Sequence, residues 1–90
     1  MLTQNNSRYL SVYQFLQLRV TTRGQTVGDA LEELEDMLHS TDNEYAHENV
    51  NTVRSIYDDI IADGILDNDT PLAQSIILVK LEIRLNTIDN

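Results

Sequence analysis

The 90-residue chain has no cysteine and no tryptophan, one proline, three glycines, and six basic residues against fifteen acidic ones. Without cysteine, neither a disulfide framework nor a thiolate metal site can form. No stretch approaches the about 18 apolar residues of a transmembrane helix, and the first ten residues lack the pattern of a signal peptide. The sequence therefore predicts a soluble, cytoplasmic protein. A hydrophobic content of 41% favours one packed domain over residues 1–90, with residues 1–8 as a flexible N-terminal segment.

Basic residues are scarcest where the acidic residues gather. The chain carries a net charge of −9, and 13 of its 15 acidic residues lie within residues 24–69, where Arg54 is the one basic residue. Direct binding to nucleic acid requires clustered lysine and arginine, and binding to anionic membrane surfaces requires positive charge as well. The charge distribution therefore argues against both kinds of partner.

The middle of the chain predicts two antiparallel helices. Apolar residues recur at helical spacing from Val27 to Leu38, and Thr26 before them is a suitable N-cap. A second helix is expected to begin near Asp42 or Asn43 and to end at Gly64, because glycine readily adopts the left-handed conformation that closes a helix. The short link "STDN" between them is typical of a helical hairpin.

The two ends of the chain resemble each other. Residues 16–22 read "LQLRVTT" and residues 81–87 read "LEIRLNT", and both alternate apolar and polar residues with the period of a half-buried strand. We therefore predict strands within residues 9–22 and 76–87. The expected fold is a small α+β domain of order β-α-α-β, in which the helix pair covers one face of a two-stranded sheet. Arg19 and Arg84 would then lie on the outward face.

A two-stranded sheet is marginal by itself and leaves exposed edges. Pairing of two chains into a four-stranded sheet would remove these edges, so a homodimer is expected from this fold. The alternative is an all-α four-helix bundle, because the content of leucine, lysine and glutamate near the C-terminus also suits a helix.

No catalytic or cofactor motif is present. There is no cysteine, no Gly-x-Ser-x-Gly and no phosphate-binding glycine loop, so we predict a protein that is not an enzyme and has no cofactor. Two carboxylate–histidine pairs lie one turn apart on the expected helices, but two histidines are too few for a di-metal bundle. Residues 59–70 have part of the spacing of a calcium loop, with Ile61 and Thr70 at positions that need an oxygen ligand and a glutamate. We therefore predict no metal site. The two pairs are Glu35 with His39 and Glu44 with His47.

The acidic middle is the strongest functional feature of the sequence. Carboxylates fixed on helices can substitute for the phosphates of nucleic acid and speed docking on a basic groove. We expect a small acidic interaction protein that inhibits or regulates a basic partner, such as a nucleic-acid-binding protein or a nuclease complex. Small phage and mobile-element proteins that block host defence nucleases are similar in size and charge. The alternative is a homodimeric structural or regulatory adaptor whose acidic face serves only solubility. The candidate partner-binding residues are Asp29, Glu32, Glu33, Asp36, Asp58, Asp59 and Asp63.

Overall fold

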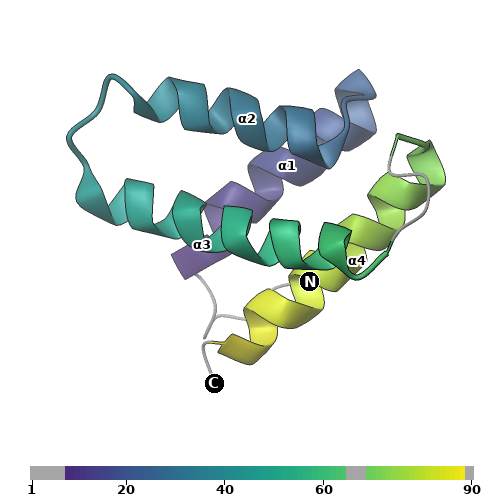
Figure 1. The fold of residues 1–90 in the computed structure, drawn as a ribbon. Coiled ribbons are helices and arrows are strands. Elements are labelled where there is room, and N and C mark those ends of the chain that lie inside the picture. Colours follow the sequence, from purple (N-terminus) through teal and green to yellow (C-terminus); the bar gives the residue numbers. More distant parts are fainter. Residues whose placement is uncertain (1–7, 65–68, 89–90) are drawn as a thin grey trace.

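The computed structural model describes residues 8–64 and 69–88, which form four α-helices (Figure 1). No strand occurs within these two ranges. The predicted β-α-α-β fold with a sheet is therefore wrong, and the alternative, an all-α four-helix arrangement, describes the chain. Most of the expected N-terminal segment lies outside the described residues. The helices are α1 (Leu10–Arg23), α2 (Val27–Leu38), α3 (Glu44–Ala62) and α4 (Pro71–Ile88).

The two helices predicted in the middle of the chain are confirmed as α2 and α3. The Thr26 hydroxyl accepts a hydrogen bond from the backbone N–H of Asp29 at 3.0 Å, and the Asn43 side chain accepts one from Ala46 N–H at 3.1 Å. These bonds satisfy N–H groups that have no partner within the first turn of a helix. α3 ends shortly before Gly64, which has a φ of +97°. The two helices lie side by side as a hairpin (Figure 1).

α1 replaces the strand predicted within residues 9–22. Its buried residues Val12 and Tyr13 lie four and three positions before the buried Leu16, which is the spacing of one helix face. Thr21 and Thr22, which favour a strand, instead donate their hydroxyls to backbone carbonyls one turn earlier, at 2.8 and 2.6 Å. Such bonds accommodate threonine within a helix. The helix ends because Gly24 adopts a left-handed conformation with a φ of 66°.

α4 replaces the strand predicted within residues 76–87, and its sequence explains the error. Leu81 and Leu85 are buried, whereas Val79 and Ile83, each two residues earlier in the chain, are exposed. Each pair lies four residues apart and therefore belongs to its own helical face. The alternation of apolar and polar residues is thus the sum of two apolar stripes on opposite sides of one helix. The buried side of α4 consists of Ala73, Gln74, Ile77, Leu78, Leu81 and Leu85.

The core lies where the four helices meet. α1 and α4 cross obliquely behind the α2–α3 hairpin in the view of Figure 1, and each helix contacts the other three. Among the described residues, none of the helices combines the length and the apolar character needed to cross a bilayer. The largest side chains that are fully buried are Leu16, Leu31, Ile60, Ile77, Leu81, Leu85, Val27 and Val53.

Candidate functional site

The outward side of α4 carries a line of large apolar side chains. Successive members are four, three and four residues apart, which places them on one face of the helix. They protrude into solvent, with exposed fractions of 71, 40, 57 and 59% in chain order. The neighbouring Ser75 and Lys80 are exposed as well. We call this surface the α4 outer stripe: Leu72, Ile76, Val79 and Ile83.

The opposite side of α4 is fixed in the core by two polar contacts. The side-chain carbonyl of Gln74 accepts the backbone N–H of Val27 at 2.7 Å, and the Tyr13 hydroxyl donates to the carbonyl of Leu78 at 3.2 Å. Burial raises the pKa of Tyr13 to about 12, and the nearby Glu82 carboxylate acts in the same direction. These contacts orient α4 so that the outer stripe lies on the side away from the core.

Three of the seven predicted acidic site residues are tied to arginines of the same chain. Arg19 and Arg84, which were expected on an outward sheet face, hold two of them. Arg19 is instead largely covered, with a side chain that is 17% exposed, and its guanidinium lies 4.8 Å from the ring centre of Phe15. The pairs and their N–O distances are Arg19–Glu33 (3.0 Å), Arg54–Asp58 (3.8 Å) and Arg84–Asp63 (2.8 Å).

The other four predicted site residues are exposed and make no ion pair within the described part of the chain. The structure also brings the two acidic helices together around Tyr57. Burial raises the pKa of Tyr57; the Arg54 charge opposes this shift, while the carboxylates of Asp58 and Asp29 add to it. α2 and α3 therefore both contribute negative charge at this point of the surface. The four exposed residues are Asp29, Glu32, Asp36 and Asp59.

A two-point ion pair joins α2 to α3. Arg54 donates from Nε to Glu35 Oε2 at 3.0 Å and from Nη2 to Glu35 Oε1 at 2.5 Å. Hydrogen bonding to Arg54 lowers the pKa of Glu35, because a bonded carboxylate favours its charged form. Glu35 therefore serves to hold the hairpin together.

The residues weighed as metal ligands partly converge. Glu35, His39 and His47 line one hollow of about 300 Å³ near the turn of the hairpin, whereas Glu44 does not contribute to it. The His47 ring nitrogen lies 2.9 Å from the carbonyl oxygen of Thr41. Within residues 8–64 and 69–88, no three His, Asp or Glu side chains are grouped so that they could hold a metal ion. Part of the sequence weighed as a calcium loop lies outside these residues.

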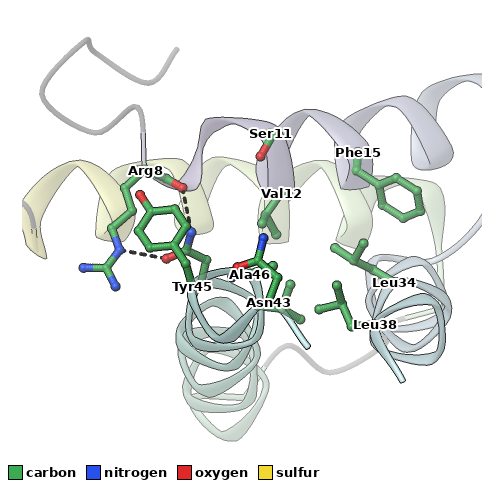
Figure 2. A pocket seen from close by; sticks show the side chains of 11 residues that line it. Arg8, Ser11, Val12, Phe15, Leu34, Leu38, Asn43, Tyr45 and Ala46 are labelled. Atoms are coloured by element: carbon green, nitrogen blue, oxygen red, sulfur yellow. Dashed lines mark hydrogen bonds between the residues drawn. The ribbon is translucent and has the colours of Figure 1, made fainter. Parts of the chain in front are cut away.

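A groove of about 460 Å³ opens between α1, the end of α2 and the start of α3 (Figure 2). This volume falls within the range of about 300–1,000 Å³ that is typical of small-molecule sites. The two ends of the groove differ in chemistry. Phe15, Leu34 and Leu38 form an apolar end, and Arg8 and Tyr45 lie at the other end (Figure 2).

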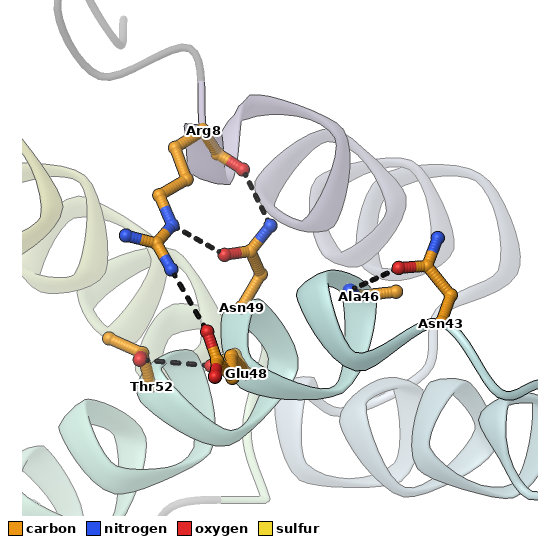
Figure 3. Close-up of polar contacts among 6 residues, drawn as sticks. All are labelled: Arg8, Asn43, Ala46, Glu48, Asn49 and Thr52. Atoms are coloured by element: carbon orange, nitrogen blue, oxygen red, sulfur yellow. Dashed lines mark hydrogen bonds and ion pairs between the residues drawn. The ribbon is translucent and has the colours of Figure 1, made fainter.

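Arg8 is held in place at the polar end of the groove (Figure 3). Its Nε donates to the side-chain oxygen of Asn49 at 2.7 Å, and the Asn49 amide donates back to the Arg8 carbonyl at 3.3 Å. Its guanidinium also lies 5.6 Å and 5.2 Å from the ring centres of Tyr9 and Tyr45. Glu48 is a more distant partner, 3.5 Å from Nη2 and itself 68% exposed. The result is a positioned cation beside an apolar hollow.

Comparison with known proteins finds no match among family models, curated proteins or solved structures. The function is therefore argued from the surfaces of this chain. Sequence reasoning missed two of them. The α4 outer stripe was assigned in part to a sheet, and the groove depends on residues from three helices that only packing brings together. The spacing of Leu72, Ile76, Val79 and Ile83 was the one signal in the sequence that could have revealed the stripe.

Proposed function

We propose that this protein is a small homodimeric adaptor whose two copies join through the α4 outer stripe. The observation that supports the proposal is the apolar character of α4 on both sides, with Ile77 and Leu81 in the core and Val79 and Ile83 in solvent. A helix that is hydrophobic all round is usually buried on all sides. A second copy packed on the stripe would bury the outward side and place both α4 helices at the centre of the dimer.

The distribution of charge favours a second copy at this surface. Two chains that each carry −9 repel one another, so they can associate only through a face where the acid is sparse. α4 (Pro71–Ile88) provides such a face, because it carries two basic residues, Lys80 and Arg84, and one acidic residue, Glu82. The acidic residues of the α2–α3 hairpin would then remain in water, where they keep the dimer soluble.

The oligomeric state of matched variants tests this proposal. Val79→Gln combined with Ile83→Gln removes the centre of the stripe, and Leu18→Gln combined with Met37→Gln is the control. The four side chains are similarly exposed, at 57, 59, 59 and 54%, so both changes should leave the fold intact. We expect the wild type and the control to sediment as dimers at micromolar concentration and the stripe variant as a monomer. A wild-type monomer, or a stripe variant that remains dimeric, would contradict the proposal.

A second candidate function uses the acidic hairpin as a docking surface for a basic partner. Carboxylates from both helices, Asp29 on α2 and Asp58 on α3, act on the pKa of Tyr57, and this favours the candidate. In this role Asp29, Glu32, Asp36 and Asp59 would supply the negative field that attracts a basic, nucleic-acid-binding surface. The ion pairs of Glu33, Asp58 and Asp63 with arginines argue against this second candidate, because a paired carboxylate contributes less to the negative field.

A further inference from the structure

We propose that the groove between α1, α2 and α3 binds a small monocarboxylate with an aliphatic or aromatic tail. The carboxylate would lie against Arg8, and the tail would extend toward Phe15 and Leu38 (Figure 2). The proposal rests on the separation of a fixed cation and an apolar hollow at the two ends of one cavity. It is independent of the dimer, because no residue of the α4 outer stripe lines the groove.

The polar end of the groove suits a carboxylate. A guanidinium carries five N–H donors in a planar fork that matches the two oxygens of a carboxylate. Asn49 uses the Nε–H of Arg8, and Glu48 approaches Nη2 only to 3.5 Å. An exposed ion pair of this kind is weak, so a ligand carboxylate can displace Glu48. The Arg8 side chain is 40% exposed and therefore accessible.

Arg8 is also ordered before any ligand arrives. Asn49 is buried, with an exposed fraction of 5%. Its side-chain oxygen accepts a hydrogen bond from Arg8 Nε, and its side-chain nitrogen donates one to the Arg8 carbonyl. The rings of Tyr9 and Tyr45 flank the guanidinium. A pre-positioned side chain loses little conformational entropy on binding, which favours affinity.

The apolar end suits a hydrocarbon tail. Phe15, Leu34 and Leu38 are only partly buried by the rest of the chain, so they retain apolar surface toward the groove. A tail placed along them would remove this surface and its own from water. A ligand with a carboxylate alone, such as acetate, would lack this contribution and should bind much more weakly.

The net charge of the whole chain acts against the binding of an anionic ligand. A charge of −9 attracts cations over long distances, but exposed charges are screened over about 8 Å at 0.15 M salt. The contact with Arg8 is short-range and is less affected by salt. We therefore expect the affinity for a carboxylate to stay constant or to rise as the salt concentration increases. The affinity of a cationic ligand for the acidic surface would instead fall.

Titration of the wild-type protein with three probes of one chain length tests the ligand class. Octanoate, octanol and octylammonium share their tail and differ in the head group. Methyl resonances of Leu34 and Leu38 would report occupancy of the groove by NMR. The proposal expects octanoate to bind at least about tenfold more tightly than the other two, since tenfold corresponds to one hydrogen bond to a charged group. Equal binding of octanol, or tighter binding of octylammonium, would overturn it.

Variants of the polar end separate Arg8 from general effects on the fold. Arg8→Gln should weaken octanoate binding by about tenfold or more and leave octanol binding unchanged. Glu48→Gln should tighten octanoate binding, because it removes the competing carboxylate. This second variant keeps the proposal testable even if Arg8→Gln disturbs the start of α1. Weaker or unchanged octanoate binding in Glu48→Gln would contradict the assigned role of Arg8.

A variant that fills the groove tests the location of the site. Ser11 lines the groove and is exposed, so Ser11→Phe should block octanoate without disturbing the core. Ser55→Phe, at an exposed position on α3, is the matched control and should bind octanoate as the wild type does. Octanoate binding that survives Ser11→Phe would overturn the assignment. Binding of a peptide with a C-terminal leucine in place of octanoate would also overturn it, because the groove would then serve a protein partner.

Discussion

The side-chain carbonyl of Gln74 on α4 accepts a hydrogen bond from the backbone N–H of Val27, the first residue of α2, at 2.7 Å. The first N–H groups of a helix have no partner within the helix, and Val27 is fully buried, so water cannot replace this bond. The Gln74 amide also donates to the carbonyl of Thr70 at 3.3 Å. One buried side chain therefore joins the starts of two helices that are far apart in the sequence.

Replacing Gln74 with alanine should destabilise the fold. Gln74→Ala would leave the Val27 N–H buried and unpaired, which costs about 1–3 kcal/mol. Ser75→Ala is the matched control, because the Ser75 hydroxyl is exposed and donates to the Pro71 carbonyl one turn earlier in the same helix. A surface change of this kind stays within about 0.5 kcal/mol. Urea denaturation followed by circular dichroism would measure both. Equal losses in the two variants would show that the bond to Val27 does not stabilise the fold.

The raised pKa of Tyr13 predicts a loss of stability at alkaline pH. Its pKa rises from 10.0 to about 12 in the folded chain, mainly through burial, so the folded state retains a proton that the unfolded state releases. This contribution to the free energy of unfolding is complete below about pH 10 and is lost as the pH rises to about 12. Denaturation curves across this range should show the decline.

Tyr13→Phe should flatten that decline. The variant also loses the bond to the Leu78 carbonyl, so it should be less stable than the wild type at neutral pH by about 1 kcal/mol. Tyr57, whose pKa is also raised, remains in the variant and maintains part of the slope. If the alkaline slope of Tyr13→Phe equals that of the wild type, ionisation of Tyr13 is not linked to unfolding.

The sequence was sufficient to predict the hairpin. Thr26 and Asn43 cap α2 and α3 as their positions indicated, because capping is a local interaction that depends on a few adjacent residues. Gly28 shows where local reasoning ends. Glycine in the first turn of a helix lowers helix stability, yet a Cβ at this position would lie 2.6 Å from the Tyr57 hydroxyl. The Tyr57 side chain of α3 occupies the space that a Cβ would need, and its position depends on how the helices pack.

The two end helices could not be predicted from period alone. A helix with one apolar side produces a clear 3.6-residue pattern, but α4 has two apolar sides, and their sum imitates the period of a strand. The distinction requires knowledge that Val79 and Ile83 remain in solvent, which is a property of packing. The same limit applies to the acidic site. The sequence indicated where the carboxylates are. It could not indicate that Glu33 pairs with Arg19, because this ion pair joins residues of two helices and depends on how they pack.

The pairing of Glu35 with Arg54 predicts a loss of stability at acid pH. The pKa of Glu35 is lowered in the folded chain, chiefly by hydrogen bonds from Arg54. A lowered pKa stabilises the fold above the unfolded pKa, and this contribution is lost as the pH falls through the folded value. Glu35→Gln should therefore reduce the acid slope and cost about 1 kcal/mol at neutral pH. Glu32→Gln, an exposed residue of the same helix, is the control and should change neither quantity measurably.

The ion pair of Glu33 changes what removal of the acidic side chains should do. Asp29→Asn, Glu32→Gln and Asp36→Asn together should leave stability unchanged or slightly higher, because all three residues are exposed and repel one another. Glu33→Gln should be destabilising, since Glu33 pairs with Arg19 at 3.0 Å and accepts from Gln25 at 3.2 Å. Thermal unfolding would compare them. A stable Glu33→Gln variant beside an unstable triple variant would reverse this assignment.

The triple variant also separates the two candidate functions. A partner that binds through the acidic hairpin should no longer bind when Asp29, Glu32 and Asp36 become amides. Its affinity for the wild type should also fall as the salt concentration rises, because exposed charges are screened over about 3 Å at 1 M. The same partner should still bind the monomeric variant with Val79→Gln and Ile83→Gln. A partner that binds through the α4 outer stripe should bind the triple variant but not the stripe variant. Its affinity should change little with salt, since apolar contacts are not screened. Calorimetry with wild type and both variants at low and high salt would distinguish these outcomes. Binding that survives the triple change and high salt but fails in the stripe variant would show that the acid serves only solubility.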